Sequence, residues 1–283
     1  MTVDQFLTQT RVLIVAGKGG VGKSTVAVSL AELAHSRGVS VAHIELDGKA
    51  LPPGLDPAVT QFSLTPGEAL REYLATHGLS RVGQRLENTG ILDLVASTAP
   101  GIDDLLVLGK IKQMEQSQEH DLIVVDGPAA GQAIGLLRAA ATMQSTVSSG
   151  PISQQAQEVR NMVSDPSRCQ VILVTTPAHT PVVELLETRQ QLIDDVGVAL
   201  GPIIVNGVDS SPLGSFDTST TEHTDLVDAW RYRQSRIHAQ HQAIDLLRSQ
   251  VDEHVLLLPR HVSTASVVSH MTRDMVSAVE SSS

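Results

Sequence analysis

Cysteine is almost missing from this sequence of 283 residues, in which Cys169 is the only one. A single thiol excludes an intrachain disulfide scaffold and any metal or iron–sulfur site that takes two thiolates from one chain. Aromatic side chains make up only 2% of the residues, so few rings are available to stack on nucleic-acid bases. Because a free cysteine behaves as a small apolar residue, we expect Cys169 to pack in the core.

Positive charge is also scarce, with 20 Lys and Arg against 31 Asp and Glu and a net charge of −11. Sequence-independent nucleic-acid binding needs a basic surface, so this balance predicts no nucleic-acid partner. No apolar run approaches the roughly 18 residues of a membrane-spanning helix. The first ten residues lack the basic and apolar regions of a signal peptide. We therefore expect a cytoplasmic protein.

Apolar residues are present in ordinary proportion, at 41%. Their continuous Val, Ile and Leu runs are typical of parallel strands buried on both faces. These runs alternate with helical patterns, which predicts an α/β fold with a doubly wound, mostly parallel sheet flanked by helices. We expect one domain over residues 1–283. The predicted strands are Val12–Ala16, Val39–Leu46, Ile91–Val95, Leu122–Asp126, Val171–Thr175, Ile203–Asn206 and His254–Leu258.

Helical patterns fill most of the intervals between these runs. Residues 210–224, rich in Ser, Thr, Asp and Gly, are predicted to form a mobile loop, and residues 281–283 a frayed tail. The predicted helices are Ser24–Ser36, Gly67–Ala75, Ile102–Glu115, Gly131–Met143, Ile152–Val163, Thr180–Asp194, Glu222–Val251 and Thr264–Val279.

The first predicted strand runs into a glycine-rich segment that matches the phosphate-binding pattern G-x-x-x-x-G-K-[ST]. Glycines let the backbone curl so that successive N–H groups face phosphate oxygens, and the following helix adds its positive end. Lys23 would contact the β- and γ-phosphates, and Ser24 would offer its hydroxyl to Mg²⁺. The residues expected to bind nucleotide here are Gly17, Lys18, Gly19, Gly20, Val21, Gly22, Lys23, Ser24 and Thr25.

A second nucleotide-binding element is the run Leu122–Asp126, which is predicted to be an apolar strand that ends in a carboxylate. This is the Walker B arrangement, in which the acid holds a water molecule of Mg²⁺. We therefore predict a magnesium site made by Ser24 directly and by Asp126 through water. The structural alternative is an aspartate that only caps a turn.

A second lysine, Lys18, makes the loop read K-G-G-x-G-K-[ST]. With this lysine the chain resembles the deviant Walker A phosphate-loop ATPases, a family that includes MinD, ParA, the nitrogenase iron protein and the arsenite-pump ATPase ArsA. The resemblance implies a phosphate-loop NTPase fold, ATP as substrate and a dimer in which Lys18 reaches the partner's nucleotide. The chain has one such loop, so the other half would be a second copy or a paralogous ATPase subunit.

Further stretches, spread from Arg11 to about Arg260, resemble the ArsA-like branch, which includes the tail-anchored-protein targeting ATPase, and most closely its short bacterial members. By this resemblance Asp47 would position the attacking water, Asn206 would hydrogen-bond the adenine and Pro259 would flank it. A solvent-exposed strand-end acid is the alternative for Asp47, and a turn former is the alternative for Asn206.

The chain also departs from this branch. Gly48 and Lys49 replace Pro and Ala after the acid, and Gly127 replaces Thr in the second switch. One cysteine predicts no metalloid chelation and no zinc C-x-x-C at a dimer interface. The resemblance implies a catalytic set of Lys18, Lys23 and Asp47 and a Mg²⁺-dependent ATPase that acts on an unidentified protein client or membrane partner.

Two alternatives of different classes stay open. The substitutions in the switches favour a nucleotide-gated binding scaffold with little hydrolysis, in which ATP selects one dimer state. The family also contains positioning proteins of the MinD and ParA type. Their membrane or DNA binding fits poorly with a net charge of −11 and with a C-terminal helix whose only basic residue is Arg273.

Overall fold

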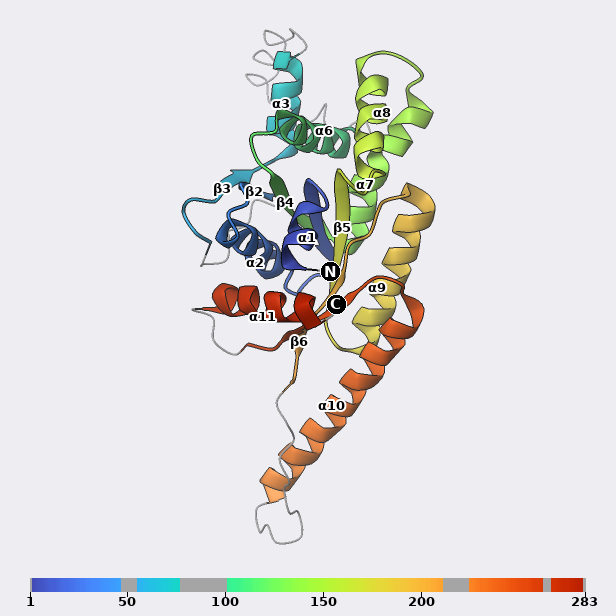
Figure 1. The fold of residues 1–283 in the computed structure, drawn as a ribbon. Coiled ribbons are helices and arrows are strands. Elements are labelled where there is room, and N and C mark those ends of the chain that lie inside the picture. The colour runs from blue at the N-terminus through green and yellow to red at the C-terminus, as the bar shows by residue number, and fades with distance from the viewer. Residues whose placement is uncertain (1, 47–54, 77–100, 211–223, 262–265, 282–283) are drawn as a thin grey trace.

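The computed structural model describes residues 2–46, 55–76, 101–210, 224–261 and 266–281 (Figure 1). Within these residues seven parallel strands form one sheet, in the order β3-β2-β4-β1-β5-β6-β7. The predicted doubly wound parallel sheet is confirmed. The strands are β1 Val12–Gly17, β2 Val41–Glu45, β3 Thr60–Ser63, β4 Leu122–Ala129, β5 Cys169–Thr175, β6 Ile203–Val208 and β7 Val255–Pro259.

Helices cover both faces of the sheet, with α2 and α11 together on one side and α7, α8 and α9 on the other (Figure 1). The first turns of the 27-residue helix α10 extend beyond the body of the sheet. None of the helices in the described ranges combines the length and apolarity needed to cross a bilayer. The helices are α1 Val3–Thr8, α2 Lys23–Ser36, α3 Pro66–Thr76, α6 Ile102–Ser117, α7 Ala130–Thr146, α8 Pro151–Val163, α9 His179–Gln191, α10 Thr224–Gln250 and α11 Val267–Ser281.

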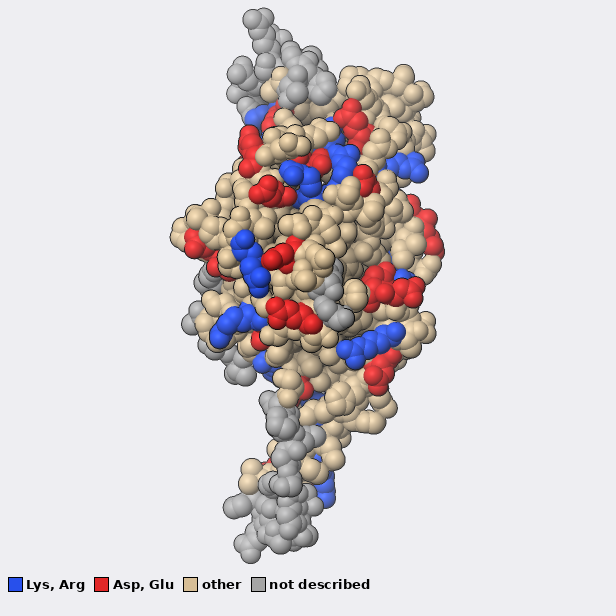
Figure 2. Space-filling model, in the orientation of Figure 1, with Lys and Arg blue, Asp and Glu red and all other residues tan. Residues whose placement is uncertain are grey.

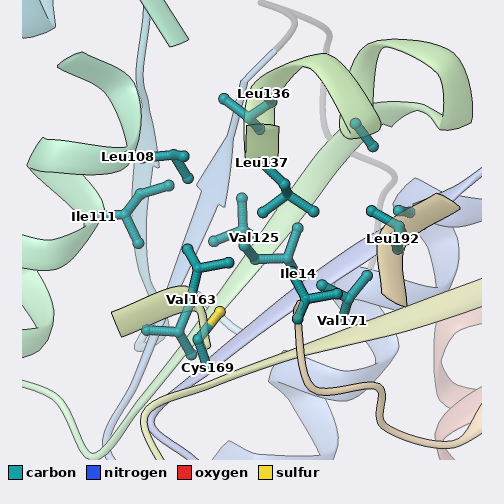
Figure 3. Packing of buried hydrophobic residues seen from close by; sticks show 14 of the residues in the cluster. Ile14, Leu108, Ile111, Val125, Leu136, Leu137, Val163, Cys169, Val171 and Leu192 are labelled. Carbon is teal, nitrogen blue, oxygen red and sulfur yellow. The ribbon is translucent and has the colours of Figure 1, made fainter. Parts of the chain in front are cut away.

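The core is divided into two layers by the sheet. Successive strand residues point to opposite faces, so Leu13 and Val15 pack toward α2 and α11, while Ile14 packs toward the other layer. Figure 3 shows Ile14 and Val125 facing Leu137 of α7. Because both faces are covered, β1 is buried at every position and β4 and β5 at all but one, which explains the continuous apolar runs.

Cys169 begins β5 and is fully buried in this second layer, beside Val163 (Figure 3). Burial raises the pKa of its thiol to about 12. The cysteine is therefore an apolar core residue, as predicted, and its thiol stays protonated at neutral pH.

Two elements were not predicted. The edge strand β3 has four exposed residues and no apolar run, so its sequence resembles a loop. The short helix α1 starts with a capping box, in which Thr2 Oγ1 accepts from Gln5 N and Gln5 Oε1 accepts from Thr2 N. The pattern T-x-x-Q is visible in the sequence and is an N-terminal helix signal.

The helix predicted over Thr180–Asp194 ends its α-helical part at Gln191. A π-helical turn, η1 (Leu192–Val196), follows and stops at Gly197, whose φ is +72°. Several predictions lie outside the described residues: the strand Ile91–Val95, Asp47 with its neighbours, nearly all of the loop 210–224, and the tail beyond residue 281.

Candidate functional site

The glycine-rich loop lies at the point where the sheet reverses its order. β1 has β4 on one side and β5 on the other; β2 and β3 lie beyond β4, and β6 and β7 lie beyond β5. In open α/β sheets the crevice at the carboxyl ends of the strands at this point is the usual ligand site. Residues 18–22 join β1 to α2, which confirms the strand–loop–helix context that a phosphate loop requires.

The backbone of this loop is open on one side and tightly packed on the other. A Cβ atom on Gly17 would lie 2.3 Å from the carbonyl oxygen of Val174, so only glycine allows β1 to approach β5 there. Gly20 has a φ of +84° and Gly22 a φ of +94°, conformations that favour glycine. Gly22 also supplies no side-chain cap to α2, which leaves N–H groups of its first turn available to an anion.

A cavity of about 380 Å³ lies over the loop. The amino group of Lys23 folds back over it and donates to the carbonyl oxygen of Lys18 at 3.3 Å. Backbone N–H groups, an ammonium group and hydroxyls around one open cavity fit a chain of phosphate groups. Its lining residues are Gly19, Gly20, Gly22, Lys23, Ser24, Thr25, Ala129 and Gln132, which brings most of the predicted loop residues together with the second switch.

Two buried carboxylates face the start of α2. Asp126 of β4 pairs in register with Glu45 of β2 and with Val15 of β1. Alternation along the strands directs both acids toward the layer that contains α2, whose first turn carries Ser24. Asp126 is 6% exposed and Glu45 is 4% exposed. Carboxylate and hydroxyl oxygens are the ligands that suit Mg²⁺, so these residues fit a metal beside the phosphate cavity.

Glu45 is a site residue that the sequence analysis did not select. It precedes Asp47 by two residues in the segment Ile44-Glu45-Leu46-Asp47. An acid inside a predicted buried strand was an available signal. Its alignment with Asp126 depends on β2 and β4 being neighbours, which the sequence does not show.

His43 lies on β2 two residues before Glu45 and is fully buried. Burial lowers the pKa of its imidazole to about 4, although the negative charge of Glu45 acts in the opposite direction. His43 is therefore neutral at pH 7 and adds no positive charge beside the two acids.

The second switch begins at Gly127, where the sequence departs from the resembled family. A Cβ atom there would lie 2.5 Å from the carbonyl oxygen of Val15. β1 and β4 change register at this place, between Val15 and Gly17. The close approach of the two backbones explains why this chain has glycine directly after Asp126.

Asn206, near the end of β6, contacts the phosphate loop. Its side-chain amide donates to the carbonyl oxygen of Val21 at 2.8 Å. A cleft of about 700 Å³ lies beside Asn206 and is lined partly by Arg233, Arg236 and Arg260. Pro259, at the end of β7, pairs with Val208 of β6. The two residues predicted to hold the base therefore lie near the ends of neighbouring strands, and Asn206 contacts the loop.

Lys18 is paired within its own subunit. Its ammonium group donates to Oε1 of Glu184 on α9, and the two side chains are 54% and 34% exposed. A second cavity, of about 320 Å³, lies beside this ion pair between the loop, the start of α7 and α9.

Charged side chains of both signs are interspersed on the face drawn in Figure 2, where the coloured residues form no continuous basic patch.

Comparison with known proteins adds a family. A model described as the CobQ/CobB/MinD/ParA nucleotide binding domain matches residues 12–211. ATPase BagA of Mycobacterium tuberculosis is 28% identical over 225 residues, which cover 71% of this chain and 66% of that protein. A protein of Halobacterium salinarum named as an arsenical pump-driving ATPase is 28% identical over 230 residues, covering 70% of this chain and 35% of the relative.

ATPase get3 of Schizosaccharomyces pombe is 28% identical over 153 residues, or 48% of this chain and 46% of that protein. The chain thus matches less than two thirds of the length of each of these three relatives.

Proposed function

Because the chain belongs to the CobQ/CobB/MinD/ParA nucleotide-binding family, with relatives named as arsenical-pump and get3 ATPases, we propose that it is a Mg²⁺-dependent ATPase that closes as a dimer around its nucleotide. The observation that carries this proposal is the cavity over residues 19–25, with an uncapped helix start, Lys23 and two buried acids beside it.

The chain's own residues would bind and orient the triphosphate. Loop N–H groups and Lys23 hold the phosphate oxygens, and Ser24 with Asp126 holds Mg²⁺, with Glu45 as a further carboxylate beside them. When bound, Mg²⁺ neutralises charge on the phosphate oxygens. Phosphoryl transfer needs little covalent chemistry from a protein, so catalysis of this kind is positioning and charge neutralisation.

Three further roles complete the proposal. Asp47, outside the described residues, orients the attacking water. Lys18 contacts the nucleotide of the partner subunit. Asn206 and Pro259 hold the adenine, in keeping with the contact of Asn206 with the phosphate loop and with the place of Pro259 on the neighbouring strand. Since the described part contains one phosphate loop, the partner is a second copy or a paralogous subunit, and the dimer acts on a protein client or a membrane partner.

The test is steady-state ATP hydrolysis by the pure chain with Mg²⁺, measured over a wide range of protein concentrations. We expect specific activity to rise with protein concentration, because each site is completed by a partner, and to vanish when Mg²⁺ is chelated. Bound ATP without turnover at any concentration contradicts the homodimeric ATPase and favours a paralogous subunit or a nucleotide-gated scaffold.

Two substitutions separate binding from turnover. Lys23→Ala removes charge-assisted hydrogen bonds of about 1.5–3 kcal/mol each, so ATP affinity should fall roughly 100-fold in calorimetry. Asp47→Asn should retain affinity and lose turnover. Lys110→Ala is the matched control, because Lys110 pairs with Glu72 on α3. Normal hydrolysis by Asp47→Asn would remove the role proposed for that acid.

A further inference from the structure

We propose that Glu184 is a positioning residue for Lys18, an inference that rests on the function proposed above. In the absence of nucleotide, Glu184 holds the ammonium group of Lys18 inside its own subunit. This ion pair has to break before Lys18 reaches the nucleotide of the partner, so Glu184 sets how readily the dimer closes.

The pair joins two distant parts of the chain. Lys18 follows β1 in the phosphate loop, Glu184 lies in the first half of α9, and Lys18 Nζ donates to Glu184 Oε1. The other carboxylate oxygen, Oε2, is buried and accepts no hydrogen bond from the described residues. No other described residue therefore makes a hydrogen bond that fixes this carboxylate.

The backbone of Glu184 is the fixed side of the pair. α9 is anchored in the core by Val182 and Leu185, which lie before and after Glu184 in the helix. Thr188 Oγ1 donates to the backbone carbonyl of Glu184 at 2.8 Å. Lys18 has a long, flexible stem and is more than half exposed. Opening of the pair therefore requires a movement of Lys18 and none of α9.

Nucleotide binding in the same subunit would loosen Lys18. The amino group of Lys23 donates to the carbonyl oxygen of Lys18 in this structure. Phosphate oxygens in the loop cavity would attract Lys23 and compete for that hydrogen bond. The cavity of about 320 Å³ beside the pair gives the Lys18 side chain room to leave Glu184. Binding of ATP to one subunit thus prepares its lysine for the partner.

The size of the effect follows from the exposure of the pair. Exposed ion pairs change an equilibrium by about 1.4- to 5-fold, since water and salt screen them. A symmetric dimer breaks two such pairs. Glu184 should therefore weaken nucleotide-dependent dimerisation by roughly 2- to 30-fold.

The closing experiment has two readouts on the full chain. The first is the rate at which an amine-reactive ester acylates Lys18 without nucleotide, followed by peptide mass spectrometry. The second is the dimer Kd with Mg²⁺ and a non-hydrolysable ATP analogue, measured by sedimentation velocity. We expect Glu184→Gln to raise the Lys18 acylation rate about 1.4- to 5-fold and to lower the dimer Kd roughly 2- to 30-fold.

The control variant is Glu187→Gln, because Glu187 lines the same cavity on the same helix and is exposed. It should change neither readout. In a Lys18→Ala background, Glu184→Gln should leave the dimer Kd unchanged, which a merely structural role of Glu184 would not predict.

An unchanged acylation rate in Glu184→Gln overturns the ion pair as a restraint on Lys18. If acylation of Lys18 is faster but the dimer Kd is unchanged or higher, the proposal that Lys18 leaves Glu184 for the nucleotide of the partner is overturned. If the unsubstituted chain does not dimerise with the analogue, the proposed homodimer is wrong, and so is the movement of Lys18 from Glu184 to the nucleotide of the partner. The acylation rates still report on the pair within one subunit.

Discussion

His43 illustrates the physics that acts on single residues in this sheet. Its imidazole is buried in β2, and neither ring nitrogen has a hydrogen-bond partner among the described residues. Removal from water penalises the charged form and lowers the pKa to about 4 from an ordinary value of 6.5. Between those two values the unfolded chain binds a proton that the folded chain does not.

The stability of the protein should therefore fall as the pH drops from 6.5 toward 4, by about 1.4 kcal/mol per pH unit from this group. Between pH 7 and pH 5 the loss due to His43 is roughly 2 kcal/mol. We expect His43→Leu to reduce the difference in unfolding free energy between these two pH values by that amount, measured by urea denaturation.

The matched control for this comparison is His238→Leu on the exposed face of α10. It controls for the loss of an imidazole as such, because this side chain is exposed. An equal pH dependence in His43→Leu and the unsubstituted chain would show that His43 gains a proton as easily in the folded state.

Site residues were predictable where a pattern of residues close in the sequence indicates their role. Lys23 and Ser24 follow from the loop pattern, and Asp126 from an acid at the end of an apolar run. Glu45 was missed because its importance comes from the register of β2 with β4. Glu184 was not selected, because its partner Lys18 lies 166 positions away in the sequence.

At the scale of elements, two backbones meet at Gly127. A methyl group there would overlap the carbonyl oxygen of Val15 at 2.5 Å and force β4 away from β1. We expect Gly127→Ala to destabilise the protein by about 1–3 kcal/mol, the range for overpacking, in denaturant unfolding. Because Asp126 precedes this residue, ATP hydrolysis should fall as well.

Gly135→Ala is the control for that prediction. Gly135 lies in the middle of α7, is exposed, and a Cβ atom there would meet nothing within 4 Å. Alanine should stabilise the helix by about 0.5–1 kcal/mol. Equal effects of the two substitutions would show that backbone proximity is not what requires glycine after Asp126.

Strands were predictable from the sequence where helices cover both faces of the sheet. Central strands are mostly apolar: β1 has no polar side chain and β5 contains the run Val171–Val174, so each appears as an uninterrupted apolar run. The edge strand β3 has one neighbour and four exposed residues, so its place is determined by hydrogen bonds to β2. The π-helical turn after α9 was not predicted, because the helical pattern of apolar residues in the sequence continues into it.

At the scale of the molecule, the sheet joins two core layers into one unit. α11 closes one layer, where Met271, Met275 and Val279 are buried in the cluster that also contains α2 residues. Cys169 lies in the other layer. Loss of packing under α11 should therefore weaken the whole domain.

We expect Met275→Ala to lower the unfolding free energy by about 2–5 kcal/mol, because a fully buried methionine leaves a cavity. Far-UV circular dichroism and the reactivity of Cys169 should report one common transition. Met114→Ala, at a partly buried position of α6, should cost less. A Cys169 that stays protected after the helical signal is lost would show that the layers unfold separately.

The sequence by itself determined the alternation of strands and helices, the phosphate loop and the acid at the end of the apolar run Leu122–Asp126, because these depend on neighbours a few residues away. The tertiary structure decided which strands lie side by side, and so which residues meet. Glu45 and Asp126 share a face, Asn206 bonds the loop, and Lys18 pairs with Glu184 only because the folded sheet brings distant segments together. Such contacts depend on strand order and register, and neither is encoded in local periodicity.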